Sequence, residues 1–193
     1  MSDDIDKSRV HFINEQKINI SKVRREGYIL DIGGGGEGVI GQLYGEQVVA
    51  IDPLESELEE APTTGALRII MNAKDLKFLD NQFNTVTSFF TMMYISNEDI
   101  EKVFKEIYRV LKLDGEFLFW DLNIPAFTNT DKDIYAVPLK IHLEDKIIET
   151  GYGVQWKGRE QNIDLYIELG KKIGFKVIEQ KLNEQTYYIK FKK

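Results

Sequence analysis

The chain has no cysteine among its 193 residues and only two histidines. Without cysteine there is no disulfide, no thiolate nucleophile and no cysteine-ligated zinc. With so few histidines the sequence also offers no convincing metal cluster. No apolar run approaches the ~20 residues of a membrane-spanning helix, and the segment MSDDIDKSRVHF lacks the basic and apolar regions of a secretory signal. We therefore expect a cytoplasmic protein with no membrane partner.

Positive charge is also scarce. The chain has 25 Lys and Arg residues and 32 Asp and Glu residues, which gives a net charge of −7. Binding of nucleic acid depends on Lys and Arg neutralising phosphates, so we expect no nucleic acid partner. Hydrophobic residues make up 42% and charged residues 30%, an ordinary globular balance. Without repeats or linkers, residues 1–193 are expected to form one domain; nothing in the sequence fixes its oligomeric state.

Apolar runs alternate with helical patterns over the first two thirds of the chain. This order predicts an α/β protein with a Rossmann-like, doubly wound, mostly parallel sheet and helices on both faces. Two final strands, joined at Asn183 and Glu184, predict an antiparallel pair at the carboxyl end. The expected strands are 28–32, 47–51, 66–71, 85–90, 116–122, 175–182 and 186–191, and the expected helices are 37–44, 97–112 and 161–173.

Two segments lie outside this alternation. Residues 6–26 carry scattered apolar positions that we interpret as one or two amphipathic helices, so that 1–27 form a helical cap. Residues 123–160 are interpreted as an insertion on the substrate side: a loop, then strands 138–148 and 150–156 turned near Gly151 or Gly153.

A glycine-rich segment, ILDIGGGGEG (29–38), follows the first predicted strand and opens a helix. Glycine lets the backbone pass close to a ligand or adopt positive φ, and a helix amino terminus suits an anionic or polar group. Asp52 ends the next strand, 19 positions after Gly33. An acid at this spacing accepts hydrogen bonds from a ribose, although Asp52 is also a plausible helix cap before Pro53. Together these features favour an adenosine-type cofactor.

Four segments resemble the class I S-adenosylmethionine-dependent methyltransferases: ILDIGGGG, VVAIDP, NAKDLKFLDNQFNTVTSFFTMMYI and VFKEIYRVLKLDGEFLFWD. The resemblance covers roughly residues 28–122, in consistent order. It implies that S-adenosylmethionine is the cofactor and that a methyl group is transferred, by in-line displacement, to a small-molecule acceptor.

The resemblance also assigns cofactor contacts. Asp31 would lie where the methionine ammonium is received, and the loop glycines would let the backbone approach the methionine portion. Asp52, followed by Pro53, would hold the ribose hydroxyls. The remaining contacts are Asn72 and Ala73 beside the adenine, Ser88 and Phe89 under the reactive methyl, and Gly33, Gly34 and Gly35 in the loop, with Leu76 and Phe78 resembling the wall over the base.

Two departures from the family pattern stand out. Asn72 replaces the usual acid beside the adenine, and Asp75 is a nearby alternative for that role. The usual third glycine of the loop falls on Glu37, with Gly38 one position later. The register of the loop is therefore open.

Catalytic residues are harder to assign, because the cofactor itself supplies the reactivity. By position, Asp121 at the end of the fifth strand is the best candidate base, with Tyr94 and Asn123 nearby. A structural role for Asp121, as a cap or a loop hydrogen bond, fits equally well. Aromatic residues of 123–160 suit either an acceptor cover or the packing of a hairpin; they are Phe127, Tyr135, Tyr152 and Trp156.

Two other functions remain open. A nicotinamide-dependent oxidoreductase would use a similar loop and acid. A non-catalytic regulatory protein would bind S-adenosylmethionine without turnover, which the absent adenine-side acid permits. Cytosine C5 methylation is excluded, because it needs a cysteine nucleophile. The sequence Ser88-Phe89-Phe90-Thr91 also lacks the Asn-Pro-Pro-Tyr type of motif found in amino-group methylases of DNA.

Overall fold

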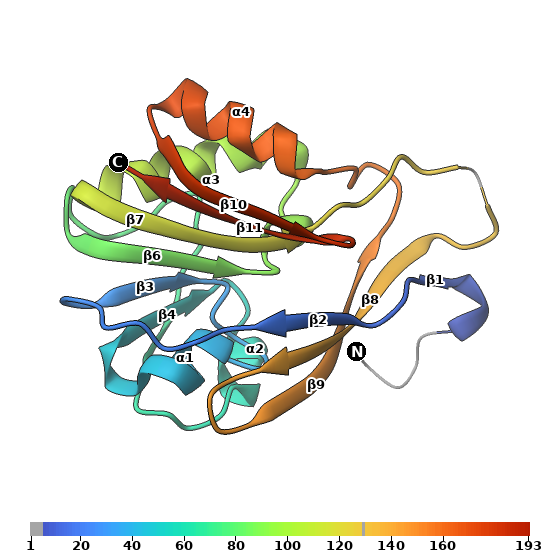
Figure 1. The fold of residues 1–193 in the computed structure, drawn as a ribbon, viewed down its shortest axis with the longest axis horizontal. Coiled ribbons are helices and arrows are strands. Elements are labelled where there is room, and N and C mark those ends of the chain that lie inside the picture. The colour runs from blue at the N-terminus through green and yellow to red at the C-terminus, as the bar shows by residue number, and fades with distance from the viewer. Residues whose placement is uncertain (1–5, 129) are drawn as a thin grey trace.

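A computed structural model describes residues 6–128 and 130–193. Its main element is a seven-stranded sheet of order β10-β11-β7-β6-β3-β4-β5 (Figure 1). Five strands are parallel, and β11 runs antiparallel to both β7 and β10. This confirms the predicted fold class. The strands are β3 (Ile29–Ile32), β4 (Val48–Asp52), β5 (Leu67–Ile70), β6 (Phe83–Phe89), β7 (Leu111–Leu122), β10 (Lys176–Asn183) and β11 (Thr186–Lys192).

Helices cover the two faces of this sheet. The helices α3 (Asn97–Val110) and α4 (Ile163–Ile173) lie together on one face (Figure 1). The short helix α1 (Val39–Tyr44) packs on the opposite face, where Ile40 meets Ile29 and Val48. The remaining helices are α2 (Glu55–Glu60) and the 3₁₀ turns η1 (Lys7–Arg9), η2 (Gly45–Gln47) and η3 (Met92–Tyr94).

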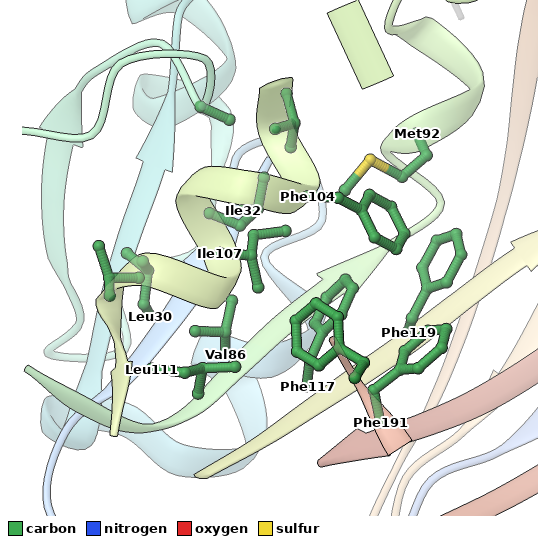
Figure 2. Close-up of a cluster of buried hydrophobic side chains, with 14 of the residues drawn as sticks. Leu30, Ile32, Val86, Met92, Phe104, Ile107, Leu111, Phe117, Phe119 and Phe191 are labelled. Atoms are coloured by element: carbon green, nitrogen blue, oxygen red, sulfur yellow. The ribbon is translucent and has the colours of Figure 1, made fainter. Parts of the chain in front are cut away.

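The main core lies between the sheet and the α3–α4 layer (Figure 2). Phe104 of α3 is fully buried and meets Phe117 edge-on at a centroid distance of 5.5 Å. Helix α3 forms here because its apolar residues recur at helical spacing, with Glu98 and Asp99 at its positive end. The helix ends earlier than predicted: β7 starts directly at Leu111, before the turn at Asp114 (φ 63°).

A second, four-stranded sheet corrects the prediction of amino-terminal helices. Strands β1 (Val10–Phe12) and β2 (Gln16–Asn19) flank β8 (Ile134–His142) and pair with it in parallel, and β9 (Ile147–Gln155) pairs with β8 antiparallel. Gln16 and Ile18 are buried while Lys17 and Asn19 are exposed, which is the period of two of a strand. Over three or four residues, scattered apolar positions fit the helical and the strand periods alike.

The predicted hairpin in 123–160 exists, but its turn was misplaced. The chain reverses at 143–146, where the Leu143 amide donates to the Lys146 carbonyl. Gly151 and Gly153 lie within β9. Val137 and Leu139 of the hairpin share a hydrophobic cluster with Phe90 and Leu122. Phe90 directly follows β6, and Leu122 is the last residue of β7. The second sheet thus covers the carboxyl edge of the main sheet.

Among the residues that the structure describes, no helix is both long and apolar enough to cross a membrane.

Candidate functional site

The glycine loop after β3 is packed so closely that side chains would not fit. A Cβ atom on Gly33 (φ 70°) would lie 2.3 Å from Thr91 Oγ1, and one on Gly35 would lie 2.6 Å from the Glu57 Cβ. A Cβ on Gly34 would lie 2.7 Å from Asp31 Oδ2. The amides of Gly33 and Gly34 both donate to the Ile51 carbonyl, at 2.8 and 3.0 Å. These contacts fix the loop against β4 and leave only backbone on its surface.

Two of the predicted acids flank this loop. Asp31 is buried and accepts a hydrogen bond from Thr87 Oγ1 at 2.7 Å. Burial raises the pKa of Asp31 to about 7, and the charge of Asp52 adds to this shift. Asp52 is half-buried, and its Oδ1 accepts from the Leu54 amide at 2.9 Å, as a cap would. Its Oδ2 has no donor in the described part of the chain, so this oxygen is available to a ligand beside the exposed Pro53.

Glu37, at the third glycine position of the family pattern, is a site residue that the sequence did not reveal. Its Oε1 accepts from the Thr150 hydroxyl and its Oε2 from the Tyr152 hydroxyl, the latter at 2.7 Å. Both donors belong to β9 of the second sheet. Gly38 follows with φ 53°, a left-handed backbone that starts α1. The displaced glycine is the one signal in the sequence for this arrangement.

The loop lies in a negative local field. Asp31, Glu37, Asp52 and Glu57 take part in none of the ion pairs formed by the described residues. Burial raises the pKa of Glu57, and the charges of Asp52 and Glu37 raise it further. Such a cluster attracts a cationic ligand and repels a polyanion.

The residues predicted beside an adenine lie in the turn after β5. Asn72 is exposed, and its Oδ1 accepts from the Lys74 amide at 3.0 Å. Ala73 and Leu76 are buried in the main core. Phe78 meets Phe83 edge-on at 5.0 Å and also belongs to this core. Asp75 is exposed and pairs with Lys77. Of these side chains, Asn72 and Asp75 are the ones open to solvent.

The end of β6 holds the two residues predicted to lie under the methyl group. Ser88 is fully buried, and its hydroxyl has no hydrogen-bond partner among the described residues. Phe89 is 8% exposed and packs against Phe90 at 4.9 Å. Phe90 adopts a left-handed φ of 51°, rare for a bulky residue. The Phe90 amide donates to the Trp120 carbonyl at 2.9 Å, which extends the pairing of β6 with β7 by one residue.

Asp121, the predicted base, has no exposed surface. Its carboxylate accepts from Gln161 Nε2 at 2.7 Å and from the amides of Leu122 and Met93 at 2.9 and 3.3 Å. Burial raises its pKa to about 7. These contacts favour the structural role, in which Asp121 holds the η3 turn; its role as a base stays a prediction. Asn123 likewise holds the start of α4, accepting from the Ile163 amide at 3.1 Å.

Tyr94, the other predicted catalytic residue, lies in the turn that follows β6. It belongs to η3 and is 47% exposed. Burial of the hydroxyl raises the pKa of Tyr94, and the charges of Asp121 and Glu37 raise it further. The phenol therefore stays protonated at neutral pH and can donate a hydrogen bond.

The predicted aromatic cover divides into two groups. Trp156 is 4% exposed, and its Nε1 donates to the Pro125 carbonyl at 2.7 Å. Tyr135 lies 5.0 Å and Phe127 5.7 Å from its ring, and His11 4.9 Å, so this group packs the second sheet. The Tyr152 ring instead lies 5.6 Å from the Phe90 ring, between centroids, and its hydroxyl donates to Glu37. Tyr152 is thus the aromatic residue of 123–160 that reaches the glycine loop.

A groove of about 470 Å³ lies away from this loop, under residues 17–25. Trp120 and Tyr188, with rings 4.8 Å apart, are in its lining, and so is Ile40 of α1. The groove is therefore on the α1 face of the main sheet. No loop glycine is among its lining residues.

Comparison with known proteins gives consistent results. Residues 30–119 match the model of a methyltransferase domain. The chain is 31% identical over 134 residues to a ubiquinone/menaquinone biosynthesis C-methyltransferase of Photorhabdus laumondii, covering 62% of this chain and 53% of that protein. It is 28% identical over 117 residues to an uncharacterized methyltransferase of Bacillus subtilis, covering 56% and 46%. The chain thus spans about half the length of the curated relatives it matches.

Solved structures share the fold. An S-adenosylmethionine-dependent methyltransferase from Mesorhizobium loti superposes with a TM-score of 0.64 at 14% identity, over 89% of this chain and 94% of that one. A protein of the same description from Methanosarcina mazei gives a TM-score of 0.64 at 17% identity, with the same coverage.

Proposed function

We propose that the chain is a class I methyltransferase that uses S-adenosylmethionine as its cofactor to methylate a small-molecule acceptor. The match of residues 30–119 to a methyltransferase domain and the shared fold support this proposal. One observation carries the proposal. The tightly packed glycine loop and the free Oδ2 of Asp52 lie together in a negative field, where a cationic nucleoside fits.

The residues present fit the cofactor. The surface of Gly33, Gly34 and Gly35 is bare backbone, which lets the methionine portion approach. Asp52 Oδ2 would accept from the ribose hydroxyls, and Asp31 would lie near the ammonium group. Asn72 keeps an unused lone pair on Oδ1 for the adenine amino group, beside Ala73.

Methyl transfer requires few catalytic side chains. S-adenosylmethionine, when bound, supplies an activated methyl group for in-line displacement. The protein aligns the acceptor and excludes water. The second sheet covers the carboxyl edge, and Tyr94 presents a neutral phenol from η3. Asp121 would hold this turn through the Met93 amide. Ser88 and Phe89 would form the floor of the site at the end of β6.

The negative field also weighs against the oxidoreductase alternative. A nicotinamide dinucleotide would bring a doubly charged pyrophosphate to the loop. Glu37 and Glu57 would repel it, and no ion pair of the described residues places Lys or Arg beside them.

The experiment is a calorimetric titration with S-adenosylmethionine, its demethylated product and NAD. We expect micromolar binding of the first two. In Asp52→Ala the affinity should fall about 10- to 100-fold, the equivalent of hydrogen bonds to a charged group. Asp164→Ala, which removes an exposed acid of α4, is the matched control and should leave binding unchanged. Preference for NAD would refute the proposal. Tight cofactor binding without methyl consumption across a broad acceptor panel would favour a regulatory protein.

A further inference from the structure

Glu37 is held in place from both sides of its carboxylate. Thr150 donates to Oε1 and Tyr152 to Oε2, across 113 and 115 residues of sequence. Two hydroxyl donors fix the orientation of the group and bring no positive charge to it. Each oxygen also keeps a lone pair for a further partner.

Several other glutamates of the fold have a cationic partner. Glu106 pairs with Arg109, Glu116 with Lys190 and Arg25, and Glu101 with Lys105 and Lys172. Glu37 is partly buried, yet no Lys or Arg of the described residues lies within ion-pair distance of it. A partly buried carboxylate held by neutral donors is most stable when a cation lies nearby.

The location of Glu37 identifies that cation. Glu37 follows Gly36 in the glycine loop, and the Glu57 carboxylate lies at the same loop, where a Cβ atom on Gly36 would be 3.3 Å from Glu57 Oε2. The geometry assigns to Glu37 the selection of the charged sulfonium cofactor over its neutral demethylated product, with Thr150 and Tyr152 orienting the carboxylate. This inference rests on the proposed function.

The charges of the two ligands supply the reason. S-adenosylmethionine carries a sulfonium, an ammonium and a carboxylate, a net charge of +1. The product retains the ammonium and carboxylate and is neutral overall. The two share every other group apart from the methyl. A fixed negative charge therefore increases the affinity for the cofactor relative to the affinity for its demethylated product. In this way Glu37 would promote exchange of the product for fresh cofactor.

The test compares the two dissociation constants in matched variants. Glu37→Gln keeps the shape and removes the charge, so we expect S-adenosylmethionine to bind about 5- to 20-fold more weakly and the product to bind within twofold of the original. Glu59→Gln removes the same charge from an exposed position on α2 and should leave both constants unchanged. In the unaltered protein, the preference for the cofactor should shrink as salt is raised.

Tyr152→Phe provides an independent variant if Glu37→Gln fails to fold. It retains the ring against Phe90 and removes the hydroxyl that orients Oε2, so selectivity should fall about 2- to 5-fold. Equal loss of both ligands in Glu37→Gln, or an unchanged ratio in both variants, would overturn the inference. Absence of binding of either ligand to the unaltered protein would instead refute the proposed function.

Discussion

The two sheets of this protein are assembled in different ways. In the main sheet, β3 and β4 are neighbours in both sequence and space, and α1 connects them. In the second sheet, β8 lies between β1 and β2, which come from the other end of the chain. The main sheet carries the glycine loop, and the second sheet covers the edge where the loop lies. The comparison shows that neighbouring units of the sequence form the glycine loop, the proposed cofactor site, whereas long-range pairing forms the sheet that covers it.

The largest expected effect comes from breaking the main core. Phe104→Ala should lower the free energy of unfolding by about 3–5 kcal/mol, because it removes a fully buried ring that packs on Phe117, Phe119 and Tyr166. Urea denaturation followed by circular dichroism would measure the change. A loss below about 1 kcal/mol would mean that this core can collapse around the cavity.

A cavity in the second sheet should act more locally. Trp156→Ala removes a buried ring and the hydrogen bond to Pro125, at a cost of about 3 kcal/mol. Hydrogen exchange should show protection lost in 10–19 and 134–155 but retained in 29–52. Titration should show cofactor affinity within a few-fold of the original. Uniform loss of protection would show that the two sheets unfold as one unit. Melting shifts with an acceptor panel in the same variant would test its predicted pocket role.

The dependence of stability on pH should come from the main sheet. Burial raises the folded-state pKa of Asp31 and of Asp121 to about 7, above the unfolded value near 3.9. The folded protein therefore binds more protons between these values. Its stability should fall as pH rises from about 4 to 7. Thermal melts at pH 5, 6, 7 and 8 would measure this, and Asp121→Asn should flatten the profile. Stability that rises over this range would contradict the assignment.

The smallest effect is expected at the surface of the second sheet. Arg9 forms an ion pair with Asp133 that ties η1 to the residue before β8. Arg9 is exposed to solvent and Asp133 is partly exposed, so Arg9→Ala should cost about 0.2–1 kcal/mol. The same denaturation measurement applies, with Lys102→Ala, which removes an exposed pair on α3, as the control. A cost above 2 kcal/mol would mean that this contact anchors the second sheet.

The same contrast explains what the sequence could and could not reveal. The strand at Ile29–Ile32, the acid at Asp52 and helix α3 were predictable because their signals are local: an apolar run, a fixed spacing and a period of 3.6. Strands β1 and β2 were not, because three or four residues cannot distinguish the two periods. Their pairing partner, β8, lies far along the chain.

Side-chain roles show the same limit. The position of Asp121 at the end of β7 was predicted, but its burial depends on Gln161, from a distant segment. The partners of Glu37 lie more than a hundred residues away, so the sequence revealed only an interrupted glycine pattern. The assignments of Asp31, Asp52, Asn72 and Ser88 to a cofactor stay predictions that the titrations above would test.

The position of β8 between β1 and β2 has a consequence for synthesis on the ribosome. Residues 10–19 emerge long before residues 134–142, which must insert between their two strands. At ~5–20 residues per second, the early strands wait on the order of ten seconds with unpaired edges. The glycine loop and its neighbouring strands are translated during that interval. The enclosure of the site is therefore among the last events of folding. A chaperone that binds residues 10–19 would keep these strands from pairing wrongly before β8 is made.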